Sequence, residues 1–310
     1  MQRKTALCLV ALGLLLAPLC AVEAHAYAFL LVPGSRSIAR HWELDQLADG
    51  RVPWRLSRSV SENVTGSRSV EEVFEAAFAA WEGVPDAAIR FAFAGTSGDR
   101  NRRPGDRTNL IALGSQENLG AGVLAATFLS STDSGALVDA DIVLDAAVPY
   151  STSAAPDPDR YDLQAVATHE IGHLIGLEHS GLVRATMVPY SERAETQGRS
   201  PESDDAIGAA LLYPESGFLD RTGTIEGRVA IGSASGVFLA HVVASTIGGR
   251  VIASAVTDPD GNYRIGGLPA DVYIVLAEPL DGPVRPANLR GFAAGFGSLG
   301  ESIVHGTAFH

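Results

Sequence analysis

Apolar residues in the first two thirds of the chain follow two different spacings. Over residues 70–81 (VEEVFEAAFAAW) they recur every three or four positions, which predicts a helix. Alternating or continuous apolar runs rich in β-branched and aromatic residues predict strands at 51–56, 89–93, 109–113, 122–129 and 139–144. This part of the chain is therefore predicted to contain a five-stranded sheet.

Two more helices follow a Pro/Asp-rich stretch that stops the strands. Asp159 or Asp162 can cap a helix over residues 163–175. Its apolar stripe consists of Leu163, Ala167, Ile171 and Leu174. A last helix over about 204–212 ends before Pro214, because proline cannot continue a helix. The prediction for residues 27–216 is an α+β domain with a twisted five-stranded sheet and about three helices.

The pattern changes after residue 217 to short β-rich runs separated by turn residues. These runs are 224–231, 237–245, 251–256, 262–265 and 272–277. Residues 258–261 (DPDG) predict a hairpin, because glycine adopts positive φ at little cost and aspartate tolerates it. We predict an all-β sandwich over 222–280. Residues 281–310, rich in Gly, Ala and Pro, are either a tail or an incomplete last element.

The first 26 residues have the pattern of a secretory signal peptide. Arg3 and Lys4 supply the positive start, residues 7–19 an apolar run, and residues 24–26 (AHA) a small-x-small cleavage site. The run is shorter than the roughly 20 residues that cross a bilayer, so cleavage is favoured over a membrane anchor. We expect a secreted or periplasmic chain that begins near Tyr27 and is not membrane-bound.

Composition limits which partners the chain can bind and whether disulfides can stabilise it. The formal charge of -13, from 36 acidic and 23 basic side chains, argues against nucleic acid, because phosphate binding needs a basic surface. Cys8 and Cys20 both lie in the predicted leader, so the mature chain would have no disulfide. It must then depend on its core and on bound ions. We expect a monomer.

The strongest chemical signal is the stretch 169–173 (HEIGH), followed by Gly176 and His179. Residues four apart lie on one face of a helix, so His169 and His173 can direct ring nitrogens at one ion. Gly176 can take the left-handed conformation that ends a helix, and this turn would bring His179 back to the same ion.

Three neutral imidazoles leave one tetrahedral position of Zn²⁺ open, as in catalytic zinc sites. Water in that position would have its pKa lowered from about 15.7 toward about 7. Glu170, next to His169, could take the proton and pass it to a leaving amine. A chance match on a surface helix is the alternative, but the two further fixed positions, Gly176 and His179, make such a match far rarer.

With these residues, the stretch resembles the metzincin clan of metalloproteases. Ser180, directly after the third histidine, matches the matrixins (matrix metalloprotease-like, peptidase family M10). Residues 186–189 (TMVP) resemble the methionine turn that lies beneath the zinc, whereas Met187 taken alone would be ordinary core filling. The resemblance covers most of residues 50–214. It implies a zincin fold and a secreted zinc metalloendopeptidase acting on extracellular proteins or peptides.

The resemblance also implies a substrate cleft. Residues 119–128 and 140–144 resemble the strands beside it, and a substrate would add as a further strand to the cleft-side edge. The pocket would be lined by His169, Met187 and residues 188–191. The residues implied to contact substrate are Val123, Leu124, Ala125, Val188, Pro189 and Tyr190.

Departures from the family pattern are equally informative. The chain has no histidine between His41 and His169, so the second, structural zinc of animal matrixins should be absent. Their latency uses a propeptide cysteine, which a mature chain without cysteine cannot supply. In the P-x-Y after the methionine turn, Pro189 fits, but Ser191 stands at the tyrosine position.

Other polar residues carry weaker signals. Asp133, Asp139, Asp141 and Asp145 raise the alternative of a calcium site, but no spaced loop motif supports it, and solvated turn acids are favoured. His241, His305 and His310 stand alone and are expected to be structural or exposed.

The C-terminal region resembles the carboxypeptidase regulatory-like, transthyretin-like β-sandwich. The matching stretches are 223–229 (GTIEGRV), 257–265 and 267–269 (GLP). Such a module would be a spacer, a stability partner or a binding surface. The rival function is therefore a non-catalytic secreted binding or adhesion protein with a relic zinc domain. Intact Glu170 weighs against it, because only chemistry needs this residue.

The motif spacing predicts one zinc per chain. Elemental analysis of the purified protein should give one zinc that chelators remove. A second tightly bound zinc would contradict the absence of the structural site.

Overall fold

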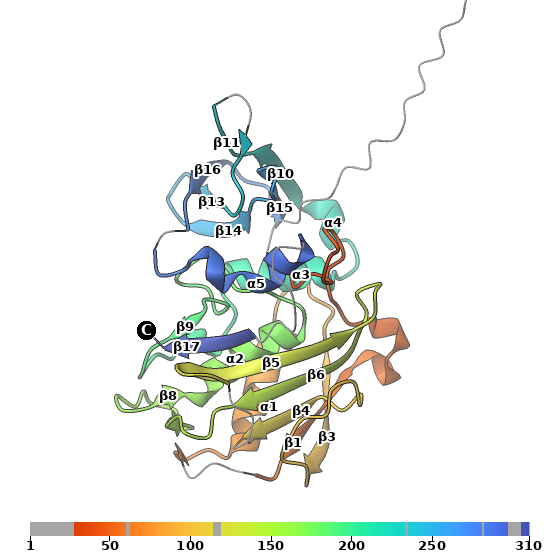
Figure 1. The fold of residues 1–310 in the computed structure, drawn as a ribbon, viewed down its shortest axis with the longest axis vertical. Coiled ribbons are helices and arrows are strands. Elements are labelled where there is room, and N and C mark those ends of the chain that lie inside the picture. Colours follow the sequence, from red (N-terminus) through yellow and green to blue (C-terminus); the bar gives the residue numbers. More distant parts are fainter. Residues whose placement is uncertain are drawn as a thin grey trace, which may run out of the picture.

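The structure is a computed structural model. It describes residues 28–59, 63–113, 119–232, 235–280 and 282–296, and the backbone of residues 305–309. The predicted signal peptide and Tyr27 lie outside these residues. A mixed sheet-and-helix part and a β-rich part follow each other along the chain (Figure 1).

Five strands form the frame of the first part. In spatial order they are β3 (Phe91–Ser97), β1 (Val52–Ser57), β4 (Leu110–Leu113), β6 (Leu137–Leu144) and β5 (Val123–Ser131). Neighbouring strands are parallel, except that β5 runs antiparallel to β6. Each strand overlaps a predicted run, so the predicted five-stranded sheet is confirmed.

Two short strands extend this sheet beyond β5. β17 (His305–Phe309) pairs antiparallel with β5, and β9 (Tyr190–Ser191) pairs parallel with β17. The sequence pattern indicated neither strand, because β9 has two residues and β17 lies in the Gly/Ala/Pro-rich segment. The edge of β5 is consequently covered by the end of the chain.

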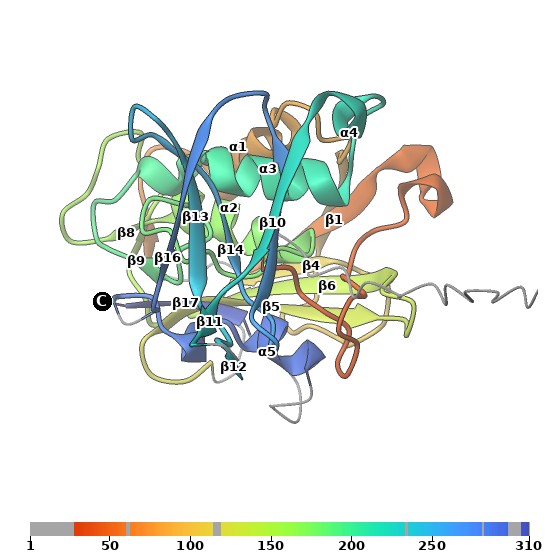
Figure 2. The ribbon, with the colours of Figure 1, turned by 90° about the horizontal axis from the view of Figure 1, so that it is seen from above.

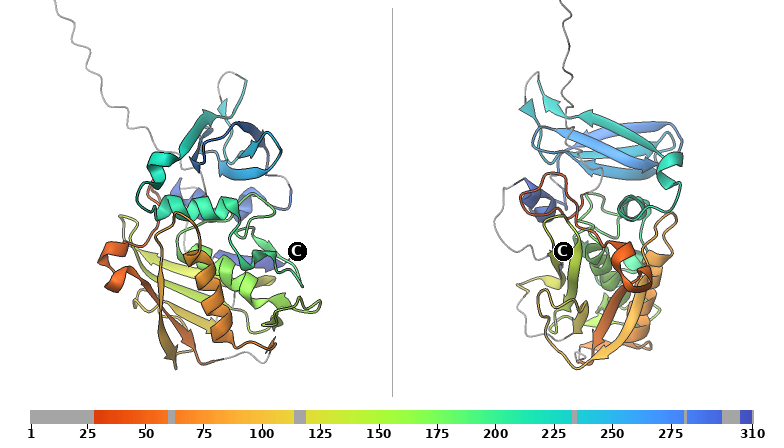
Figure 3. Two further views of the ribbon diagram at one scale, coloured as in Figure 1. Left: turned by 180° about the vertical axis from the view of Figure 1, so that it is seen from behind. Right: turned by 90° about the vertical axis from the view of Figure 1, so that its right-hand side faces the viewer.

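Two helices pack together on one face of the sheet, α1 (Val70–Glu82) and α2 (Leu163–Leu174) (Figure 3). A third, α3 (Ser203–Leu212), lies against strands of the β-rich part. All three predicted helices are present, with ends within one residue of the prediction. The shorter elements are η1 (Leu44–Gln46), η2 (Ala48–Gly50), β2 (Val64–Thr65), β7 (Tyr150–Ser151), β8 (Tyr161–Asp162) and η3 (Gln197–Arg199).

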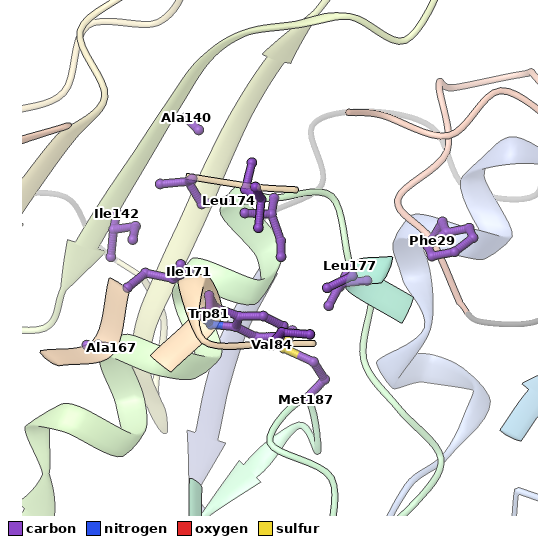
Figure 4. Close-up of a cluster of buried hydrophobic side chains, with 14 of the residues drawn as sticks. Phe29, Trp81, Val84, Ala140, Ile142, Ala167, Ile171, Leu174, Leu177 and Met187 are labelled. Atoms are coloured by element: carbon purple, nitrogen blue, oxygen red, sulfur yellow. The ribbon is translucent and has the colours of Figure 1, made fainter. Parts of the chain in front are cut away.

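The core lies between the two packed helices and the sheet (Figure 4). Trp81 of α1 is fully buried, and its indole N–H donates to the carbonyl of Thr168 on α2 at 2.8 Å. Every residue of α2 except Gln164 is buried or nearly so. The predicted apolar stripe is therefore only one of several covered faces, since the sheet, α1 and η3 all pack against α2.

The β-rich part begins with the short helix α4 (Phe218–Arg221) and contains two sheets. β10 (Gly223–Arg228) pairs with β15 (Asn262–Leu268). β13 (His241–Thr246) lies between β14 (Val251–Val256) and β16 (Tyr273–Glu278). A small ladder joins β11 (Ala230–Ile231) to β12 (Ser235–Gly236). In Figure 2, which is seen from above, these strands cross in front of α3.

The predicted hairpin at residues 258–261 is wrong. The turn itself forms, because the Gly261 N–H donates to the Asp258 carbonyl at 2.9 Å and Gly261 has φ +83°. However, β14 before the turn pairs with β13, and β15 after it pairs with β10. The turn thus carries the chain from one sheet to the other.

Beyond β16 the chain returns to the first part as η4 (Pro286–Asn288) and α5 (Arg290–Gly295). Phe292, a residue of α5, is buried, and a Cβ at Gly295 would lie 2.5 Å from Leu31 Cδ1. The described part of the C-terminal segment is therefore packed against the start of the described chain. Among the described helices, none has the length and apolar character of a membrane span.

The two packed helices begin at different kinds of cap. Ser69 and Glu72 form a reciprocal capping box at the exposed start of α1. Asp162 accepts from the Ala165 N–H at 2.8 Å and also from Nε of Arg199 at 2.9 Å. The cap of α2 therefore doubles as one half of a largely buried ion pair.

Removal of these two caps should have unequal effects. Asp162→Ala is expected to lower the free energy of unfolding by about 3 kcal/mol, because a cap and a charge-assisted bond are lost together. Ser69→Ala should cost about 1 kcal/mol. Urea unfolding of both variants checks this, and equal losses would show that the Arg199 contact contributes nothing.

Candidate metal centre

Three histidine side chains converge at the end of α2. Nε2 of His169 lies 3.1 Å from Nε2 of His173, which lies 3.2 Å from Nε2 of His179. All three are at most 5% exposed. Within the described residues they are the only group of three or more His, Cys, Asp or Glu placed to share a metal ion.

A tight turn at Gly176 delivers the third histidine. The Gly176 N–H donates to the carbonyl of His173 at 2.9 Å, and the Leu177 N–H donates to that of Gly172 at 3.0 Å. These two bonds form a Schellman motif, which requires the left-handed conformation at Gly176, where φ is +104°. A Cβ there would collide with the Arg40 carbonyl oxygen, so both conformation and space demand glycine.

The other ring nitrogen of each histidine fixes the tautomer. Each Nδ1 lies within hydrogen-bond distance of a backbone carbonyl, which can only accept, so Nδ1 carries the proton and Nε2 presents a lone pair. Nδ1 of His169 lies 2.8 Å from the carbonyl oxygen of Thr186, and Nδ1 of His173 lies 2.8 Å from that of Leu177. Nδ1 of His179 lies 2.6 Å from the carbonyl oxygen of Asn288.

This donor set fits zinc. Three lone pairs at such distances repel one another unless a cation lies between them. Tetrahedral Zn²⁺ with Zn–N bonds near 2.0–2.1 Å would separate the nitrogens by about 3.3–3.4 Å. The observed separations of 3.1 and 3.2 Å are within a few tenths of an ångström of this value.

Glu170 directly follows His169 on α2 and is fully buried. Its Oε2 accepts from the hydroxyl of Thr127 on β5 at 2.7 Å, and that hydroxyl is also 3.0 Å from the Glu170 carbonyl. Thr127 thus links α2 to β5. The sequence showed this threonine only as one residue of a predicted strand.

Met187 lies beneath α2, next to Trp81 (Figure 4). A Cβ on Gly172 would overlap the Met187 sulfur and would lie 2.9 Å from the Trp81 ring. Gly172, the first glycine of the motif, therefore lets the methionine approach the helix. The Met187 carbonyl accepts from the Ser180 N–H at 2.8 Å, and this bond connects the loop that carries Met187 to the turn after His179.

A buried carboxylate of α3, that of Asp205, holds the loop around Thr186 and Met187, called here the methionine loop. Asp205 accepts from the N–H groups of Thr186 at 2.7 Å and Met187 at 3.1 Å. Burial, and then the nearby Asp204, raise the pKa of Asp205 to about 7, while the backbone donors oppose this shift. The sequence indicated Asp204 and Asp205 only as the start of the last predicted helix, residues 204–212.

Asp204 connects the site to the β-rich part. Its carboxylate accepts from the Ser180 hydroxyl at 2.6 Å and from the N–H of Ser254 on β14 at 2.7 Å. Burial raises the pKa of Asp204. His241 of β13 is buried nearby, close to Gly181, and its Nδ1 lies 3.0 Å from Oε1 of Glu278. This histidine is therefore structural, one of the two alternatives that the sequence left open. The side chains of His305 and His310 lie outside the described residues.

Glu178 and Asn288 complete the surroundings of the third histidine. Glu178 accepts from the His179 N–H and from the N–H of Phe292 in α5, both at 2.9 Å. Asn288 Oδ1 accepts from the Tyr190 hydroxyl at 3.0 Å. Sequence reasoning missed both. The only hint for Glu178 is its place beside His179, and no local pattern points to Asn288.

The candidate substrate residues fall into two groups. Val188 and Tyr190 line a cavity of about 460 Å³ beside His169, together with Ser191 and Pro283. Pro189 is buried and lies outside the cavity lining, as does Met187. The remaining candidates, Val123, Leu124 and Ala125, belong to β5, where Leu124 and Ala125 are fully buried.

The four acidic candidates for calcium separate by burial. Asp139 and Asp141 on β6 are each 1% exposed and accept from the N–H groups of Gly105 at 3.0 Å and Leu110 at 2.9 Å. The expectation of solvated turn acids is therefore wrong for these two, because the loop before β4 covers them. Asp133 is exposed and Asp145 is half-buried. Burial raises the pKa of Asp141 to about 7.

A mixed sheet, three converging imidazoles and an adjacent buried glutamate together define a zinc metalloprotease-type centre. Residues 42–214, more than half of the chain, match the matrixin family (peptidase family M10), and the chain belongs to this family.

Stretches of the chain are also similar to individual proteins. Matrix metalloproteinase-16 of Homo sapiens is 37% identical over 76 residues, which is 24% of this chain and 12% of the relative. Metalloendoproteinase 1-MMP of Arabidopsis thaliana is 50% identical over 52 residues, 17% and 14% of the two chains. Metalloendoproteinase 1 of Glycine max is 39% identical over 92 residues, which is 30% of this chain and 29% of the relative. The matches thus span less than a third of each relative.

Gly176→Ala should weaken metal binding as well as stability. We expect the alanine to displace the turn and His179, so that zinc is lost at chelator concentrations that the natural chain withstands. Gly95→Ala is the matched control, since Gly95 has φ +87° and open space around it. That control should lose only about 1–2 kcal/mol of stability and keep its zinc. Zinc titration against a competing chelator checks both, and equal zinc affinity in the two variants would contradict the role of the turn.

Proposed function

We propose that this chain is an exported, zinc-dependent endopeptidase that hydrolyses peptide bonds of extracellular proteins or peptides. The observation that carries the proposal is the convergence of three histidine Nε2 atoms at the end of α2, the helix on which the buried Glu170 directly follows His169. Membership of the matrixin family and the leader-like first 26 residues support it.

In this reaction His169, His173 and His179 hold the metal. Zinc, when bound, acidifies a coordinated water and polarises the scissile carbonyl. Glu170 takes a proton from the attacking water and delivers it to the leaving amine. The Thr127 hydroxyl fixes the orientation of the Glu170 carboxylate, and the buried surroundings strengthen each of these charge interactions.

The substrate would lie extended along β5, bonded to the backbone of Val123, Leu124 and Ala125 as an added strand. One of its side chains would enter the cavity next to His169, against Val188 and Tyr190. The identity of that side chain would set the cleavage preference.

We also propose that residues 222–280 form the carboxypeptidase regulatory-like β-sandwich and act as a stability partner. The bond from the Ser254 N–H to Asp204 supports this role, because it joins β14 to the helix that holds the methionine loop. Asp139 and Asp141 are proposed as calcium ligands, since a hard cation would offset the burial of their charges.

Glu170→Ala should keep its zinc and lose nearly all peptide cleavage. The expected fall in kcat/KM is about 10²–10⁴-fold, the usual contribution of general acid–base catalysis. Glu75→Ala, which removes an exposed carboxylate from α1, is the control and should keep full activity. A metal-replete Glu170→Ala protein that still cleaves would refute the assigned role. Casein clearance with and without chelator separates the enzyme from the binding-protein rival.

When the protein holds zinc but no calcium, its free energy of unfolding should fall as pH rises from about 4 to 7. Burial raises the pKa of Asp141 in the folded state to about 7, above its value near 3.9 in the unfolded state. Between these two values the folded state binds more protons than the unfolded state, so the stability that this proton contributes is lost as pH rises. Added calcium should reduce the fall, and Asp141→Asn should remove the part due to this residue. Urea unfolding of both proteins across this pH range is the measurement. Indifference of the natural chain to calcium would exclude the calcium site.

A further inference from the structure

The last strand of the chain occupies the edge that the proposed substrate would use. β17 runs antiparallel to β5, with His305 opposite Thr127 and Thr307 opposite Ala125 (Figure 1). On its other side it runs parallel to β9, with Ala308 opposite Tyr190. β17 is therefore an internal strand that fills the space between two chain segments.

This position places β17 at the candidate catalytic residues. His305 is paired with Thr127, the residue whose hydroxyl bonds to Glu170. The strand also contacts α2, the helix that carries two of the three converging histidines. Its far end reaches Tyr190, which lines the cavity beside His169. One segment thus runs from the general-base side of the site to the cavity side.

We propose that residues 305–309 (β17) are an intramolecular ligand of the cleft that excludes peptide substrates. The proposal rests on the proposed function for its effect on turnover. The slot between β5 and β9 holds one strand, and β17 already pairs with both of its walls. A substrate can therefore pair with β5 only after the end of the chain has left.

Tethering makes such an occupant effective even when its intrinsic affinity is low. Eight residues, 297–304, separate Phe296 of the packed C-terminal segment from His305. A short tether of this kind gives an effective concentration on the order of millimolar. A free peptide with a Kd of about 0.1 mM would then, as a tail, reduce access of substrate by roughly tenfold.

The first experiment compares the full chain with a chain that ends at Val304. Both are zinc-loaded and assayed with a fluorogenic peptide, and the shorter chain should show a kcat/KM about tenfold higher, mainly through a lower KM. The ratio should not depend on enzyme concentration. A ratio that changes with dilution would mean that a second copy supplies the strand, and would overturn the intramolecular proposal.

A matched pair of full-length variants guards against misfolding of the shortened chain. Thr307→Pro should raise kcat/KM as the truncation does, because proline cannot donate to a ladder and is not tolerated in an internal strand. Thr307→Val keeps a good strand former and should behave as the natural chain. Equal activity of the two variants would contradict the proposal.

Two further measurements do not depend on turnover. Amides of residues 123–127 in β5 should exchange hydrogen faster in the chain that ends at Val304 than in the full chain. The synthetic hexapeptide HGTAFH should bind the shortened chain that carries Glu170→Ala, and should bind the full-length Glu170→Ala chain at least tenfold more weakly.

These readouts separate the two proposals. If neither chain cleaves peptides but exchange and hexapeptide binding differ as expected, the enzymatic function fails and the occupancy of the cleft stands. If the folded shortened chain has unchanged kcat/KM, unchanged exchange in β5 and no affinity for the hexapeptide, the intramolecular ligand is refuted.

Discussion

The candidate centre depends on three hydrogen bonds from imidazole Nδ1 groups to backbone carbonyls. Each bond leaves Nε2 unprotonated and turned toward the common point, which is what a cation requires. The carbonyls belong to the turn after α2, to the methionine loop and to the segment after β16. The geometry of the three histidines is therefore a property of the whole fold, although two of them lie on a single helix.

Support for this arrangement comes from chain segments far apart in the sequence. Asp205 holds the methionine loop, Asp204 joins the turn after His179 to β14, and Glu178 joins His179 to α5. Each is a buried carboxylate bonded to backbone N–H groups, and such groups are costly to leave unpaired. The β-rich part and the C-terminal segment are consequently bonded into the surroundings of the centre.

Local patterns were sufficient for much of the fold and for the candidate ligands. Periodicity located α1, α2 and all five strands of the main sheet, and spacing alone indicated that His169, His173 and His179 would converge. The contacts of Asn288 and Thr127 were not predictable, since each joins residues more than forty positions apart. The turn at 258–261 was recognised, but turn chemistry does not decide which strands pair. The burial of Asp141 depends on a loop that the alternation within β6 cannot reveal.

The bond between His179 and the Asn288 carbonyl also determines the order in which the centre can form during synthesis of the chain. Asn288 lies 109 residues after His179, so a growing chain presents all three histidines well before the carbonyl partner of His179 has been made. The third imidazole gains its fixed tautomer last. Formation of the centre is thereby coupled to synthesis of the chain as far as Asn288, and a chain that stops before this residue would lack the carbonyl that fixes the third imidazole.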